Sequence, residues 1–165
     1  EQVIDYAISE TKLPLYDVNI CADCLYAIGT NSGYSLVPSV FGKRSALTNW
    51  SPLGIPNWYP QDKFIPKLVK DKNKKEFLSF HEMFSSIAGW SQFENDYKKL
   101  GIKLCDNTPD EILDIVCELH NEVVNGTTQE KTTLQSKFND LFFNHDGYVG
   151  SQISQKFLER HETLL

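Results

Sequence analysis

The chain has 165 residues, which suits one domain of ordinary size built around a single hydrophobic core. Apolar residues make up 41% and charged residues 23%, values that exclude disordered and collagen-like chains, and no apolar stretch is long enough to predict a membrane span. The net charge of −6 argues against nucleic acid as a partner, because the chain as a whole repels a polyanion.

The first segments predict a short strand and a helix. β-Branched and aromatic residues favour a strand over residues 3–7, and the composition of residues 16–25 favours a short helix. Cys21 and Cys24 have the spacing of a redox or zinc pair, but no second pair follows, so we interpret them as small side chains packed on that helix. Because the chain begins with Glu1 in a predicted strand, we expect it to be part of a longer protein.

The next segments predict a βαβ unit. Residues 26–28 predict a buried strand, and residues 29–33 are turn formers. The apolar residues of 34–41 have helical spacing, and Gly42 is placed to end that helix. A second strand is predicted at 44–48. Two strands joined by a short helix are parallel and lie in a covered sheet. The predicted fold is therefore an α/β, three-layer, Rossmann-like domain with a parallel sheet.

The remaining chain predicts a long loop, a strand and a helical extension. Residues 49–62 carry three prolines, so we expect an ordered loop that serves a site. Residues 63–69 predict a strand. Ser79 and Glu82 form a predicted capping box that opens a helix through Ile87. Beyond it we expect an edge strand at 102–105 and helices at 92–100, 109–124, 129–143 and 154–164. Residues 1–90 would form the Rossmann-like core and residues 91–165 a helical part of the same domain.

Two polar segments carry candidate chemistry. The loop of Gly29, Thr30, Asn31, Ser32 and Gly33 lies between a strand and a helix, where backbone amides, hydroxyl groups and the helix dipole favour an anion. The alternative is a tight connection that binds no ligand. The basic run of residues 67–75 is typical of a solvated loop, and the alternative is a surface that faces phosphates or anionic lipid headgroups.

Several short motifs resemble one family. They are Gly29-Thr30-Asn31-Ser32-Gly33, Leu36-Val37-Pro38, Phe41-Gly42 and Ala46-Leu47-Thr48-Asn49-Trp50-Ser51-Pro52-Leu53. By these motifs the chain resembles a family of bacterial glycosyltransferases, densely over residues 15–85 and again at 153–158. More remotely it is similar to fucosyltransferase-like enzymes of the GT-B fold.

The resemblance implies the donor-binding, C-terminal half of a glycosyltransferase of polysaccharide biosynthesis. Its donor would be a nucleoside diphosphate sugar, and its acceptor a glycan or a lipid-linked precursor. A missing N-terminal half would bind that acceptor. Such an enzyme is expected in the cytoplasm or at the inner face of the membrane. The alternative is a non-catalytic nucleotide or phospho-ligand binding module from a truncated transferase.

The resemblance also assigns roles along the sheet edge. Residues 29–33 would contact the pyrophosphate. Asn49 would bind base or sugar, while Trp50 would either stack on the ligand or anchor the core. Lys67 is a candidate counter-charge for the leaving diphosphate, or else an exposed lysine at a strand end.

Two further candidates lie on the helix after the capping box. Glu82 would accept hydrogen bonds from a ribose diol or serve only as the cap, and His81 would act as acid or base or be structural. No Asp-x-Asp pair occurs, so no metal and no other cofactor is implied. The sequence also lacks the glycine motifs of dinucleotide and P-loop proteins and the serine elbow of α/β-hydrolases.

Overall fold

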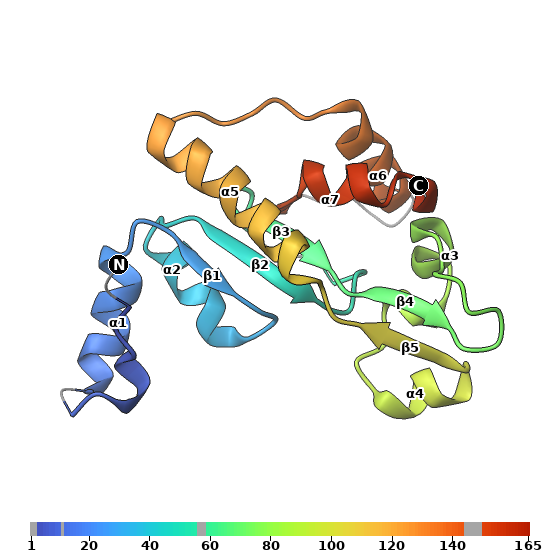
Figure 1. The fold of residues 1–165 in the computed structure, drawn as a ribbon, viewed down its shortest axis with the longest axis horizontal. Coiled ribbons are helices and arrows are strands. Elements are labelled where there is room, and N and C mark those ends of the chain that lie inside the picture. The colour runs from blue at the N-terminus through green and yellow to red at the C-terminus, as the bar shows by residue number, and fades with distance from the viewer. Residues whose placement is uncertain (1–2, 11, 56–58, 144–149) are drawn as a thin grey trace.

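A four-stranded parallel sheet forms the centre of the computed structural model, which describes residues 3–10, 12–55, 59–143 and 150–165 (Figure 1). Its spatial order is β1-β2-β3-β6. The strands are β1 (Ala27–Gly29), β2 (Ser45–Trp50), β3 (Lys63–Pro66) and β6 (Gln152–Ile153). The fold is α/β and Rossmann-like with three layers, as the sequence predicts.

Helices cover both faces of this sheet. The hydroxyl of Ser39 in α2 (Val37–Val40) lies 3.3 Å from that of Ser45, whereas Lys63 forms an ion pair with Glu122 of α5 (Pro109–Asn125). Lys63 is in register with Ala46, the neighbour of Ser45. Because successive side chains of a strand point to opposite faces, α2 and α5 lie on opposite sides of the sheet. Figure 1 shows α5 crossing in front of β2.

The helix boundaries confirm most of the local signals. Thr108 and Glu111 form a capping box at the start of α5, and Gly126, with a φ of 62°, ends it in the left-handed conformation. The predicted capping box of Ser79 and Glu82 opens α3 (Phe80–Phe84). That helix is shorter than expected, because Ser86 is extended and the chain resumes as a 3₁₀ turn at Ile87–Gly89.

The predicted strand at 63–69 is in fact two strands in two sheets. β3 ends at Pro66, and β4 (Leu68–Asp71) pairs antiparallel with β5 (Ile102–Cys105), which is the predicted edge strand. Lys67 lies between them, and its amide donates to the Trp50 carbonyl at 3.0 Å. This bond and the pairing of Trp50 with Pro66 extend β2 into the predicted loop, of which residues 56–58 lie outside the described part. α4 (Glu94–Lys99) packs against β5.

The N-terminal prediction of a strand at 3–7 is wrong. Within the described part of the chain these residues belong to no strand, and Tyr6–Ile8 form a 3₁₀ turn that the Asp5 carboxylate caps by accepting from the Ala7 amide at 3.2 Å. The Tyr6 hydroxyl then bonds the Leu13 backbone just before α1 (Pro14–Asp23). β1 is an edge strand with an exposed Ile28, so it is less buried than predicted.

One hydrophobic core joins both halves of the sequence. Phe138 of α6 (Thr133–Phe143) packs its ring against Phe64, Phe80 and Phe84. The predicted last helix is α7 (Gln155–Arg160) followed by a 3₁₀ turn at Glu162–Leu164, and the two-residue β6 before it is too short to leave a sequence pattern. No helix in the described ranges has the length and apolar character needed to cross a bilayer.

Candidate functional site

A shallow cleft of about 330 Å³ opens at the carboxyl ends of the parallel strands. It is lined by Thr30, Asn31, Asn49, Lys67 and Asp106. The first four come from the ends of β1, β2 and β3, and all four are residues that the sequence analysis proposed. Ligands of open α/β sheets bind at this edge, where loops from neighbouring strands converge. Asp106 follows β5 and was not predicted.

Gly29 shapes the loop rather than touching the cleft. A Cβ atom at this position would lie 2.3 Å from the Ser35 hydroxyl oxygen and 2.5 Å from the Ser35 Cβ. The Gly29 carbonyl also accepts a hydrogen bond from the Thr48 hydroxyl at 3.2 Å. Glycine is therefore needed for the 3₁₀ turn Gly33–Leu36 to pack against β1.

The loop offers fewer free amides than expected. The Ser32 amide donates to the Thr30 carbonyl at 2.7 Å, and the Ser32 carbonyl accepts from the Ser35 amide at 3.0 Å. Ser32 therefore belongs to the internal structure of the turn. Within the described residues, the amides of Asn31 and Gly33 donate to no acceptor. Asn31 lines the cleft, so its amide remains for a ligand there, whereas Gly33 is not among the lining residues.

Asparagine side chains fix the geometry of the cleft. Asn31 donates through Nδ2 to the Ser51 carbonyl, which ties the loop to the segment after β2. Asn49 has a φ of 53°, a left-handed conformation that asparagine tolerates better than most residues. Its amide donates to Asn107 Oδ1 at 2.5 Å, and the Asn107 amide donates back to Asn49 Oδ1 at 2.8 Å.

Asn107 is a residue whose role the sequence analysis missed. Besides its exchange with Asn49, it donates through Nδ2 to the Pro66 carbonyl at 2.8 Å. It is buried and holds the ends of β2 and β3 together at the cleft. The sequence here predicts only that a helix begins at Pro109, which gives no indication of partners so distant along the chain.

Lys67 supplies the positive charge of the cleft. Its ammonium lies 2.6 Å from the Asp106 carboxylate, and this hydrogen bond, with the charge of Lys67, lowers the pKa of Asp106 below its ordinary value. Asp106 is 76% exposed and Lys67 27% exposed. An exposed pair of this kind contributes less than about 1 kcal/mol, so an anionic ligand can replace the carboxylate as the partner of Lys67.

Trp50 takes the second of its two predicted roles. The side chain is only 5% exposed, belongs to the core and donates through Nε1 to the Ile55 carbonyl at 2.8 Å. Its ring does not line the cleft. The structure therefore places Trp50 as a core anchor and corrects its interpretation as a residue that stacks on the ligand.

His81 and Glu82 lie on α3 and do not line the cleft. The Glu82 carboxylate accepts from the Ser79 amide at 2.8 Å and from its hydroxyl at 3.1 Å, and these bonds lower the pKa of Glu82. This is the capping role. His81 is exposed, and the structure does not bring it to the residues it was expected to serve.

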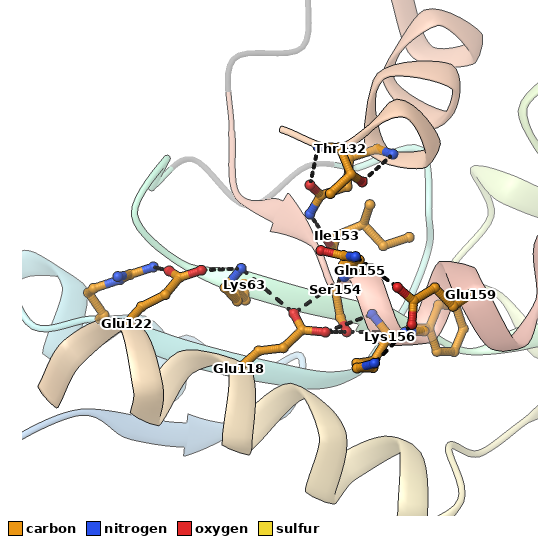
Figure 2. A network of polar contacts seen from close by, with 12 residues as sticks. Lys63, Glu118, Glu122, Thr132, Ile153, Ser154, Gln155, Lys156 and Glu159 are labelled. Atoms are coloured by element: carbon orange, nitrogen blue, oxygen red, sulfur yellow. Dashed lines mark hydrogen bonds and ion pairs between the residues drawn. The ribbon is translucent and has the colours of Figure 1, made fainter. Parts of the chain in front are cut away.

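A second polar network lies inside the domain, away from the cleft (Figure 2). Lys63 is 2% exposed, and its ammonium lies 2.9 Å from Glu122 and 3.7 Å from Glu118. Glu122 also pairs with Arg44. Glu118 accepts from the Ser154 hydroxyl at 2.8 Å and from the Lys156 amide at 2.7 Å. The network joins β3, α5 and α7, so its role is structural.

Comparisons of the chain with protein-family models, with curated proteins and with solved structures find no match.

Proposed function

We propose that the cleft binds the diphosphate of a nucleotide sugar and that the chain is the donor-binding half of a glycosyltransferase. The transferred group would be a hexose or deoxyhexose and the acceptor a glycan or lipid-linked precursor. One observation carries this proposal. Thr30, Asn31, Asn49 and Lys67, from the ends of three neighbouring parallel strands, line a single cleft.

The groups in this cleft suit a diphosphate. The Lys67 ammonium supplies charge, and the amide of Asn31 supplies an uncommitted donor among the described residues. In glycosyl transfer the bond from the sugar C1 to the diphosphate oxygen breaks, so negative charge grows on the departing phosphate. A fixed ammonium and backbone amides stabilise that charge more as it grows, which lowers the barrier.

The experiment is calorimetric titration with pyrophosphate, UDP, GDP, CMP and their sugars. Hydrogen bonds to charged groups contribute about 1.5–3 kcal/mol, so Lys67→Ala should weaken nucleotide binding roughly 10- to 150-fold. Lys156→Ala is the matched control, since Lys156 is also an exposed lysine in an ion pair, with Glu159 at 3.1 Å, but lies outside the cleft. Binding of none of these ligands, or equal losses in the two variants, would contradict the proposal.

A second candidate is a phospho-ligand binding module without catalysis. The cleft favours it in one respect, because His81, the predicted acid or base, does not line it. Incubating the chain with a donor that binds, and measuring release of free nucleoside diphosphate with and without glycan acceptors, separates the two functions. Binding of pyrophosphate as tight as that of the nucleotide sugars, without turnover, supports the module, because a donor-binding half would also contact the base and the sugar. Turnover that is lost in Lys67→Ala supports the transferase.

A further inference from the structure

We infer that β4, β5 and α4 form a basic lobe that docks on an anionic lipid surface. The basic lobe is defined as residues 67–77 and 93–103. In Figure 1 its elements lie at one end of the molecule, with α1 at the other. This inference goes beyond the proposed function and does not depend on it.

The lobe concentrates positive charge in an acidic protein. It carries eight lysines against the four acidic residues Asp71, Glu76, Glu94 and Asp96, a net charge of +4. The whole chain has a net charge of −6, so the rest carries −10. Half of the 16 basic residues of the chain therefore lie in these two short segments. The lysines are Lys67, Lys70, Lys72, Lys74, Lys75, Lys98, Lys99 and Lys103.

The fold brings these lysines together from separate segments. Lys70 and Lys103 are direct partners in the antiparallel pairing of β4 and β5, an arrangement in which like charges destabilise a sheet. Lys72, Lys98 and Lys103 line one hollow of about 210 Å³. Glu94 also lines it and pairs with Lys98 at 2.9 Å, so the hollow keeps a net positive charge. Such a hollow is suited to a lipid headgroup phosphate.

Exposed apolar side chains accompany this charge. Phe93 is 72% exposed, Leu100 45% and Phe77 40%; Phe93 and Leu100 flank the two ends of α4. The Lys70 ammonium lies 5.7 Å from the centre of the Phe77 ring. Proteins bind a bilayer surface through this combination of side chains. The lysines contact anionic headgroups, and the neighbouring phenylalanine and leucine side chains insert at the boundary between headgroups and acyl chains.

A bilayer fits this lobe better than nucleic acid does. A flat surface can touch the lobe alone, whereas a long polyanion would also meet the −10 charge on the rest of the chain. Lys67 and Asp106 lie at the junction of the lobe with the main sheet and line the cleft. Docking the lobe would therefore bring the cleft close to the membrane, where the lipid-linked acceptor of the proposed function would lie.

Vesicle co-sedimentation tests this inference directly. The chain should bind vesicles of phosphatidylcholine mixed with phosphatidylglycerol, should leave pure phosphatidylcholine vesicles unbound, and should be released at about 0.5 M salt. Each lysine near the surface is worth about a fivefold change, so Lys74→Gln/Lys75→Gln should lower the partition coefficient roughly 25-fold. Phe93→Ser should lower it as well.

The matched control is Lys131→Gln/Lys137→Gln, which removes the same charge from exposed positions outside the lobe and should leave vesicle binding unchanged. The inference would be overturned if the two double variants lost vesicle binding equally. It would also be overturned if the chain bound both kinds of vesicle equally or bound neither. Tight binding of a single-stranded RNA without vesicle binding would also overturn it and would assign the lobe to nucleic acid. Nucleotide titrations of the Lys74→Gln/Lys75→Gln variant should match those of the parent chain, so failure here is distinct from failure of the proposed function.

Discussion

Asn49 and Asn107 each accept, through the side-chain oxygen, a hydrogen bond from the backbone amide of the other, at 2.5 and 2.8 Å. These residues are 58 positions apart, and the exchange locks the end of β2 to the residue before the N-cap of α5. The buried Asn107 and the partly buried Asn49 satisfy each other's polar groups in this way, and Asn49 is thereby held in its left-handed conformation at the wall of the cleft.

Replacing Asn107 should therefore damage both stability and the cleft. Asn107→Ala leaves the Asn49 amide and the Pro66 carbonyl without their partner, so we expect a loss of about 2–3 kcal/mol in the free energy of unfolding. Urea denaturation measures this loss. Asn95→Ala, an exposed substitution in α4, is the control and should change the value by less than about 0.5 kcal/mol. A similar small change in both variants would contradict the role assigned to Asn107.

Two glycines of the same loop should differ sharply. Gly29→Ala places a methyl group 2.3 Å from the Ser35 hydroxyl, and we expect a destabilisation of about 1–3 kcal/mol. Gly33→Ala is the matched control, because no atom lies within 4 Å of its added Cβ. The double variant Gly29→Ala/Ser35→Gly removes the clashing side chain and should recover much of the loss. Thermal unfolding of the three variants shows whether it does.

Acid should weaken the junction of α5 and α7 through Glu111. Burial raises the pKa of Glu111, but the hydrogen bonds from His161 at 2.5 Å and from Thr108 outweigh it, and the pKa is lower than usual. A carboxyl whose folded pKa is depressed contributes stability above its unfolded pKa of about 4.3 and loses it as the pH falls through the folded value.

Glu111→Gln tests this pH dependence while keeping the capping box, because glutamine serves at that position too. In urea titrations between about pH 6 and pH 3, the variant should lose less stability than the parent chain. Identical pH profiles would show that the Glu111 charge does not contribute.

The buried network around Lys63 should behave as a unit. Lys63→Met leaves Glu118 and Glu122 without the ammonium between them, and removing one partner of a buried ion pair costs about 3–5 kcal/mol. Adding Glu122→Gln to Lys63→Met should restore part of this loss, since the network then holds one positive charge, on Arg44, and one negative charge, on Glu118. A double-mutant cycle by chemical denaturation measures the coupling, and purely additive losses would contradict it.

Sequence patterns predicted the elements whose signals are local. The capping box of Ser79 and the left-handed cap at Gly42 depend on residues within one turn, and both are found in the structure. The parallel pairing of β1 and β2 followed from a short connection that only a βαβ unit accommodates. The same strand ends put Thr30, Asn31 and Asn49 at one edge of the sheet, whereas Lys67 was named from the resemblance and not from a predicted strand end.

The rest depends on contacts between distant segments. The predicted strand divides at Lys67 because the residues after it pair with β5, which the local pattern does not indicate. Asp106 lies beside Lys67 although the two residues are 39 positions apart in the chain. Trp50 has the same sequence signal whether it stacks on a ligand or fills the core. Which it does is decided by the Ile55 carbonyl and the neighbouring core residues.

β3 has a lysine at its first residue and another just after its last, in opposite surroundings. Lys63 is enclosed between carboxylates, so an amine-reactive reagent can modify it only when the domain opens. Lys67 is accessible in the native state, and a ligand in the cleft would shield it. The labelling rate of Lys63 therefore reports global unfolding, and that of Lys67 reports occupancy of the cleft. Both amines lie in one short peptide, so the two rates can be measured together.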